Sequence, residues 1–131
     1  MKSIEFVTLP EAMLLHKKTI DRFGGILGVR DLGLLESALM QPQMSMFDEY
    51  IYKDIFQMGS AYFYHIIKNH PFLDGNKRAG LLITLVFFQK NNMSIIAQQD
   101  ELYQVAMDTA ASKMTKEELA VFFKRQAQLI D

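Results

Sequence analysis

The sequence predicts an all-α protein, a compact bundle of about six helices around one buried central helix at residues 77–90. Two features lead to this prediction. Residues 79–88 are apolar nearly all the way round a helix, which is typical of a helix that protein covers on every side. Elsewhere, helix start and stop signals follow one another along the chain, and only short stretches have the character of edge strands, of which we expect one or two.

The composition is that of one small domain. The chain has 131 residues, half of them hydrophobic, which is enough for one core, so we treat residues 1–131 as a single domain. A net charge of −1 gives no general attraction to nucleic acid or to an anionic membrane. Cysteine is absent, which excludes disulfides and thiol chemistry. The N-terminus lacks a signal-peptide pattern and the apolar run is too short to span a bilayer, so we expect a cytoplasmic protein.

The first helix begins at a capping box, because Thr8 is followed three residues later by Glu11. Its helical stripe ends at the glycine pair at positions 24–25. Residues 4–7, before the box, are predicted to form a short edge strand. His16 lies in this helix beside two lysines, and we expect it to be solvated or half-buried.

A second helix is predicted from Asp31, which can cap it, to Met40, and Pro42 closes it. Residues 41–53 then form a polar and aromatic connection, for which an ordinary surface loop is the simpler interpretation.

Residues 55–67 carry apolar side chains at helical spacing, which indicates a core helix, and the small residues 59–61 allow another helix to pack closely. This helix must end near Asn69, because His70 precedes a proline and is therefore biased towards extended geometry. That bias turns the imidazole out of the helix. His65, by contrast, is expected to pack or bond within the core.

After the central helix, residues 89–92 interrupt the apolar pattern and residues 93–97 are predicted to be extended. A further helix is expected to start at Asp100. The last helix is expected after a second capping box, formed by Thr115 and Glu118.

The nine residues 70–78, His-Pro-Phe-Leu-Asp-Gly-Asn-Lys-Arg, concentrate chemically capable groups at the mouth of the predicted core. Asn76 is a plausible helix N-cap, with Lys77 and Arg78 in the first turn. Two cations beside the positive end of a helix are each disfavoured by roughly 0.3–1 kcal/mol, unless an anion lies between them and the free backbone N–H groups. A phosphate would be such an anion, although both side chains could also simply extend into water.

Two further residues of this stretch favour catalysis. His70 can take up a proton near neutral pH. Asp74 offers hard oxygen ligands, and Mg²⁺ typically binds one or two carboxylates together with substrate phosphates. A base, a metal ligand and an anion site are the parts that phosphoryl or nucleotidyl transfer to a hydroxyl requires.

These nine residues resemble the signature of the Fic/Doc family, His-x-Phe-x-Asp/Glu-Gly/Ala-Asn-Gly/Lys-Arg. Lys77 stands where AMP-transferring Fic proteins carry glycine, and lysine there is similar to the Doc (death-on-curing) branch of toxins. Residues 23–31 and 33–38 resemble the N-terminal pattern of Doc-like proteins, so that the resemblance covers residues 6–129. It implies a Fic/Doc-like helical bundle, and it gives residues 41–53 a second interpretation, a flap that positions a protein target beside the site.

The resemblance also implies roles for the motif. His70 would deprotonate the target hydroxyl, and Asp74 would hold Mg²⁺ on the phosphates of ATP. Gly75 and Asn76 would leave room and donors for phosphate oxygens, and Lys77 and Arg78 would neutralise charge. Phe72 has no chemistry and would anchor the loop in the core.

In Doc-like proteins, lysine at the position of Lys77 is associated with a nucleotide bound in the reverse direction to that in AMP-transferring Fic proteins. It then presents its γ-phosphate to the histidine, which makes the protein a kinase. The implied substrate is a hydroxyl residue of translation elongation factor Tu, and its phosphorylation arrests translation. Two alternatives stay open: AMP (nucleotidyl) transfer to a protein hydroxyl, and a catalytically silent binding domain. The kinase interpretation rests on the resemblance alone, because the usual protein-kinase motifs are missing.

A toxin of this kind requires an inhibitor. The inhibitory helix motif that many Fic proteins carry, Ser/Thr-x-x-x-Glu-Gly/Asn, is not found, since the nearest match at residues 45–50 ends in tyrosine. The resemblance therefore implies a separate Phd-like antitoxin, whose C-terminal segment would dock as a helix in an apolar groove of this domain.

Overall fold

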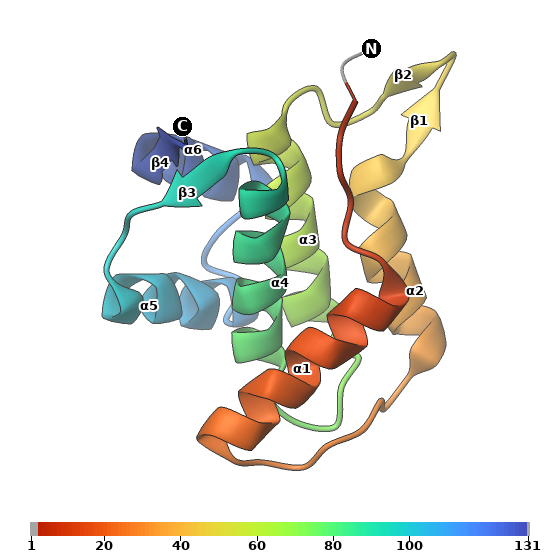
Figure 1. The fold of residues 1–131 in the computed structure, drawn as a ribbon, viewed down its shortest axis with the longest axis vertical. Coiled ribbons are helices and arrows are strands. Elements are labelled where there is room, and N and C mark those ends of the chain that lie inside the picture. The colour runs from red at the N-terminus through yellow and green to blue at the C-terminus, as the bar shows by residue number, and fades with distance from the viewer. Residues whose placement is uncertain (1–2, 131) are drawn as a thin grey trace.

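Two antiparallel helices, α3 (Ile55–Asn69) and α4 (Asn76–Lys90), form the centre of the molecule in the computed structural model, which describes residues 3–130 (Figure 1). Helices α1 (Leu9–Phe23) and α5 (Gln99–Ala110) pack against α4. Helices α2 (Leu32–Met40) and α6 (Lys116–Gln126) pack against α3, with α2 at the right of the central pair and α6 at its left in Figure 1. None of residues 79–88 is exposed, which confirms the buried central helix. The six α-helices within residues 3–130 confirm the all-α bundle.

Side-chain caps define the helix starts. Both predicted capping boxes are present, at Thr8 with Glu11 and at Thr115 with Glu118. Asp31 accepts a 3.0 Å hydrogen bond from the backbone N–H of Leu34 and so caps α2. These starts were predictable because a cap is a local interaction within four residues.

Two short antiparallel strand pairs accompany the helices. The first is a hairpin of β1 (Ser45–Met46) and β2 (Glu49–Tyr50), which follows the 3₁₀ turn η1 (Gln41–Gln43). The second joins β3 (Met93–Ile95), within the predicted extended piece, to β4 (Ala127–Leu129) near the C-terminus.

The strand predicted at residues 4–7 is wrong. This segment is extended but pairs with no strand, because side chains of the bundle satisfy its backbone groups. The hydroxyl of Tyr62 accepts from the Val7 N–H at 2.9 Å, and the Asn91 side chain bonds both the N–H and the C=O of Glu5, at 3.0 and 2.9 Å.

The core between α3, α4 and α6 is aromatic, with a set of fully buried rings: Tyr62, Phe63, Phe87, Phe88 and Phe123. A Cβ added at Gly59 would overlap the ring of Phe88, so glycine is needed there for α3 to approach α4. The close approach predicted from residues 59–61 is thereby confirmed, and the two central helices hold the loop between them rigidly in place.

The interpretation of residues 41–53 as a flap beside the functional loop is wrong. Figure 1 shows the β1–β2 hairpin at the end of the molecule opposite to the α3–α4 loop. Tyr50 packs on Phe6 with ring centroids 5.7 Å apart, and Phe6 stacks on Phe87 near the C-terminal end of α4. The hairpin precedes α3 and the loop follows it, so the length of that helix separates them, about 22 Å for 15 residues.

Within residues 3–130, none of the helices combines the length and the apolar character that crossing a membrane requires.

Candidate active site

The α3–α4 loop is anchored by Phe72. Its side chain is fully buried, and its backbone forms an isolated antiparallel bridge with Val29. The amide of Asn76 holds the same residue at both backbone groups: Oδ1 accepts from the Phe72 N–H at 2.9 Å, and Nδ2 donates to the Phe72 carbonyl at 3.0 Å. The predicted anchoring role of Phe72 is confirmed, and the path of the loop is fixed from within.

Residues 24–31, which we call the covering segment, run along the loop from the other side. The Leu73 N–H donates to the Gly28 carbonyl at 3.0 Å, and the Arg30 N–H donates to the Pro71 carbonyl at 2.7 Å. The loop is thus held between the covering segment and the first turn of α4.

His70 follows the last residue of α3 in a left-handed conformation, with φ 54° and ψ 52°, and not in the extended geometry predicted from the proline after it. Its N–H still donates to the Ile66 carbonyl at 3.2 Å, as in a left-handed helix terminus. Arg30 stabilises this terminus, because Nε donates to the His70 carbonyl at 2.7 Å and Nη2 to the Asn69 carbonyl at 2.9 Å. A left-handed non-glycine residue costs on the order of 1–3 kcal/mol, which such contacts offset.

The strained backbone of His70 presents an accessible imidazole. The residue is exposed, and neither ring nitrogen has a hydrogen-bond partner among residues 3–130. The ring is therefore free to accept a proton from a bound hydroxyl group.

Asp74 is exposed but its carboxylate is oriented. Oδ1 accepts from the Gly75 N–H at 2.9 Å, and Oδ2 accepts from the Ile26 N–H of the covering segment at 3.1 Å. A Cβ at Gly25 would lie 2.6 Å from Oδ2, so the covering segment can approach this closely only with glycine there.

The donor set around Asp74 fits Mg²⁺ only when a ligand supplies further oxygens. Each carboxylate oxygen keeps a lone pair beyond its single N–H bond. Among the described residues, no group of three or more His, Cys, Asp or Glu side chains could form a metal cage. A single carboxylate together with phosphate oxygens is, however, a common arrangement for Mg²⁺.

Helix α4 begins differently from the prediction. Gly75, left-handed with φ 73° and ψ 26°, is the N-cap, and Asn76 is already helical, because its amide turns back to Phe72. The backbone N–H groups of Asn76, Lys77 and Arg78 have no acceptor within residues 3–130. The helix start therefore offers free donors to an anion, from the backbone and not from the Asn76 side chain.

The two cations of the first turn lie in different environments. Lys77 is half-buried and Arg78 is exposed, and neither is in an ion pair in the part of the chain that the structure describes. The Arg78 guanidinium carbon lies 4.4 Å from the ring centroid of Phe23 and 5.3 Å from that of Tyr103. This stacking directs Arg78 towards the cleft between α1 and α5, so its contact with a phosphate stays a prediction.

His16 is a site residue that the sequence interpretation missed. It was expected to be solvated or half-buried, but only 2% of its surface is exposed. Its ring stacks on Phe72, with centroids 3.8 Å apart and planes within 6°, and its Nε2 lies 2.8 Å from the carbonyl oxygen of Asp74. The signal was its position, since residue 16 shares the buried face of α1 with Ala12 and Thr19.

His65 lies away from the loop, half-buried between α3 and α6. Its Nε2 is 3.1 Å from the Nζ of Lys116, and burial, followed by the positive charge of Lys116, lowers the pKa of His65 to about 4. The imidazole is thus neutral near pH 7 and accepts a hydrogen bond from the lysine.

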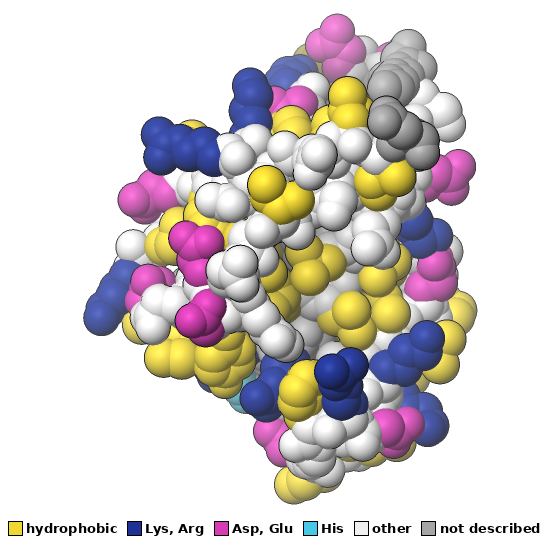
Figure 2. Space-filling model, turned by 60° about the vertical axis from the view of Figure 1, so that its left-hand side comes forward, with side chains coloured by type: hydrophobic (Ala, Val, Ile, Leu, Met, Phe, Trp, Pro, Cys, Tyr) yellow, Lys and Arg dark blue, Asp and Glu magenta, His cyan; other side chains and the backbone are white. Residues whose placement is uncertain are grey.

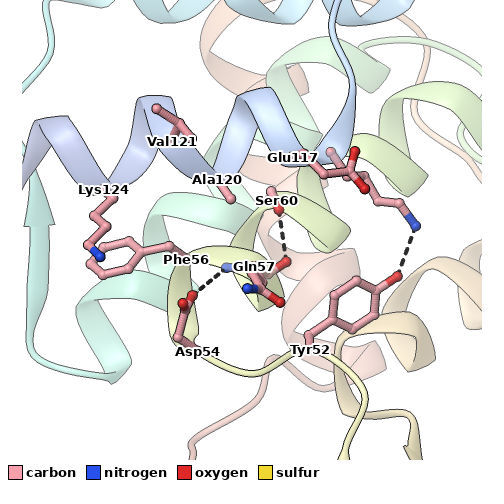
Figure 3. A pocket seen from close by; sticks show the side chains of 10 residues that line it. Tyr52, Asp54, Phe56, Gln57, Ser60, Glu117, Ala120, Val121 and Lys124 are labelled. Atoms are coloured by element: carbon pink, nitrogen blue, oxygen red, sulfur yellow. Dashed lines mark hydrogen bonds between the residues drawn. The ribbon is translucent and has the colours of Figure 1, made fainter.

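Lys116 also lines a pocket of about 410 Å³ between the start of α3 and α6 (Figure 3). Polar groups here bond to one another: Lys116 donates to the Tyr52 hydroxyl at 2.9 Å, and the Gln57 N–H donates to Asp54 at 2.9 Å. This pocket is therefore a separate feature and adds no group to the loop.

The family assignment agrees with this geometry. The Fic/DOC family model matches residues 6–88, which include the covering segment, the loop, all of α3 and α4 as far as Phe88. The chain belongs to the Fic/Doc family.

Two relatives place it in the Doc branch. It is 28% identical over 115 residues to the protein kinase doc of Escherichia phage P1, which covers 88% of this chain and 90% of that one. It is 33% identical over 78 residues to the toxin Doc of Mycolicibacterium smegmatis, and this match spans 60% of each protein.

Replacing Gly25 with alanine should displace the Asp74 carboxylate. The added Cβ would collide with Oδ2, so the Ile26 N–H loses its acceptor and its amide exchange with solvent accelerates. Gly24→Ala is the matched control: its φ of 82° is also unfavourable for alanine, but no atom lies within 4 Å of the new Cβ. Both variants should lose about 1–3 kcal/mol of stability from backbone strain, and only Gly25→Ala should alter the Ile26 amide. Equal exchange at Ile26 in the two variants would contradict this description of the site.

Proposed function

We propose that this chain is the toxin of a toxin–antitoxin pair, an ATP- and Mg²⁺-dependent protein kinase that phosphorylates a hydroxyl residue of translation elongation factor Tu and thereby arrests translation. One observation carries the proposal: an unbonded, exposed imidazole and an oriented carboxylate share a loop whose helix start has free N–H groups. The name of the phage P1 relative, a protein kinase that matches over most of its length, supports the choice of reaction.

His70 acts as the general base in this mechanism. Its free ring nitrogen accepts the proton of the target hydroxyl as the oxygen attacks the γ-phosphorus, and the bond from the γ-phosphorus to the β–γ bridging oxygen breaks, so that ADP leaves. General-base catalysis of this kind typically contributes about 10²–10⁴-fold to the rate. The hydrogen bonds of Arg30 to the carbonyls of Asn69 and His70 keep the imidazole outside α3.

The groups that follow His70 bind the triphosphate. Asp74 would hold Mg²⁺, which when bound neutralises charge on the phosphate oxygens. The N–H groups of Asn76, Lys77 and Arg78 donate to phosphate oxygens at the positive end of α4, while Gly75 leaves room for them. The ammonium group of Lys77 adds a positive charge, which stabilises the negative charge on the phosphate oxygens in the transition state.

Lys77 is the residue on which the transferred group depends. The Fic proteins that transfer AMP carry glycine here, which leaves space for the nucleotide to approach the helix start with its α-phosphorus towards the base. A half-buried lysine side chain fills that space, which favours the reversed nucleotide and γ-phosphoryl transfer. AMP transfer is the second candidate for the same site, and a silent binding domain is the third.

ATP labelled at the α- or the γ-phosphate distinguishes these reactions. Incubation of the purified chain with Mg²⁺, labelled ATP and elongation factor Tu should transfer label from the γ position only. Replacing His70 with alanine should reduce the transfer about 10²–10⁴-fold. His65→Gln is the matched histidine control and should transfer label at the rate of the wild type, since His65 lies away from the loop.

Label transferred only from the α position would establish nucleotidyl transfer in place of the kinase. Growth arrest that persists unchanged in His70→Ala, without labelling, would favour the binding domain.

We further propose that a Phd-like antitoxin occupies the cleft between α1, α4 and α5. This cleft has a volume of about 640 Å³, and its floor is formed by the side chains of Leu81, Leu82, Leu85 and Leu102. Lys18, Arg22 and Arg78 line it and are in no ion pair within residues 3–130. Figure 2 shows hydrophobic side chains gathered in a hollow of this face, with basic side chains below them. An amphipathic helix with acidic residues would match both features.

Charge reversal on α1 tests the docking site. The double variant Lys18→Glu with Arg22→Glu should bind the proposed Phd-like antitoxin, to be sought as the product of a neighbouring gene, at least about tenfold more weakly and with a smaller salt dependence. A control with the same change in net charge, Lys113→Glu with Lys124→Glu, alters exposed lysines elsewhere and should bind normally. Calorimetric titration measures the affinity of each double variant for the antitoxin. Equal affinity of the two double variants would place the antitoxin on another surface.

A further inference from the structure

Of the three histidines in the chain, His16 is the only one that is buried. Only 2% of its surface is exposed, so direct proton transfer to or from a bound substrate does not explain it. A buried imidazole is unfavourable unless its polar atoms are bonded, and the bond here is to the backbone of the loop, 58 residues further along the chain.

The direction of this bond follows from its acceptor. The Asp74 carbonyl oxygen can only accept, so the Nε2 of His16 must carry the proton and donate it across 2.8 Å. The bonded carbonyl belongs to the peptide between Asp74 and Gly75. It therefore lies between the carboxylate and the left-handed N-cap of α4.

The plane of the imidazole is also fixed. The ring stacks on Phe72, whose N–H and C=O are both bonded by Asn76. On α1, the Thr19 hydroxyl donates to the His16 carbonyl at 2.7 Å, and both of these residues are buried. His16 thus connects α1 to the anchored end of the loop and to the residue that carries the carboxylate.

We propose that His16 is a positioning residue for the nucleotide site: it sets the Asp74–Gly75 peptide so that the Asp74 carboxylate and the free N–H groups of α4 face one bound Mg²⁺–triphosphate. The catalytic consequence rests on the proposed function, whereas the effect on the loop does not. Without the bond, the Asp74 carbonyl loses its fixed orientation, and this weakens the hydrogen bonds that the Asp74 carboxylate accepts from the N–H groups of Ile26 and Gly75.

Two variants separate the hydrogen bond from the packing. His16→Phe keeps an aromatic ring that can stack on Phe72 but removes the donor. His16→Gln loses the ring but retains an N–H donor at about the same distance from the backbone. If the hydrogen bond positions Asp74, the glutamine variant must restore what the phenylalanine variant loses.

The first readout requires no activity. In His16→Phe, amide exchange at Ile26 and Gly75 should become roughly tenfold faster, while the amides of Phe63 and Phe123 in the aromatic core keep their protection. In His16→Gln, exchange at Ile26 and Gly75 should return towards that of the wild type. Unchanged exchange at both amides in His16→Phe, or a uniform increase over the whole chain, would overturn the proposal.

The second readout is kinetic. The Mg²⁺ concentration for half-maximal label transfer should rise about five- to tenfold in His16→Phe, with a smaller change in kcat, and His16→Gln should reverse it. A lower kcat at an unchanged Mg²⁺ requirement would contradict a positioning role. If the wild type transfers no label at all, the proposed function fails, but the amide-exchange result still decides whether His16 orders the loop.

Discussion

The burial of Phe72 is the constraint on which the site depends. A loop between two antiparallel helices would ordinarily be mobile, but this loop has a fully buried aromatic side chain at its centre. Asn76 bonds both backbone groups of that residue, His16 stacks on its ring, and Val29 pairs with its backbone. Because the anchor is part of the core, the groups on either side of it, His70 and Asp74, have defined positions before any ligand binds.

The anchored loop also supports unfavourable backbone conformations. His70 and Gly75, which flank the loop, are both left-handed, and one of them is not a glycine. Arg30 holds the carbonyl side of His70, and the covering segment holds the carboxylate of Asp74. Such strain persists only where the surrounding contacts determine it. Here it turns the imidazole out of α3 and leaves the backbone N–H groups of the first turn of α4 without acceptors in the described residues. The arrangement is preorganised for an anionic ligand, since the free N–H groups require no rearrangement to bind it.

Interactions that are close in sequence were predictable. The two capping boxes, the Asp31 cap and the apolar run of α4 each depend on residues a few positions apart, and all of them are confirmed. The motif residues were identified because they are consecutive. Their family resemblance, too, is borne out by the match over residues 6–88.

Interactions between distant residues were not predictable. Arg30 reaches the carbonyl of a residue 40 positions away, and this contact stabilises the left-handed conformation that His70 has despite the following proline. The bond from His16 to Asp74 could not be predicted from the sequence either, because nothing in the apolar and basic residues around His16 indicates a hydrogen-bond partner 58 positions away. The position of the β1–β2 hairpin depends on the direction and length of α3, so the connection at residues 41–53, for which a flap beside the site was the second interpretation, lies at the other end of the molecule.

The central claim is that a metal-bound triphosphate meets the imidazole where α4 begins. The most direct measurement is an NMR titration of the ¹⁵N-labelled chain with Mg²⁺ and a non-hydrolysable ATP analogue, which follows the backbone amides and the histidine side chains. The account predicts that the largest changes map to residues 70–78 and to the covering segment. Changes confined to the pocket of Tyr52 and Lys116, with residues 70–78 unaffected, would contradict it.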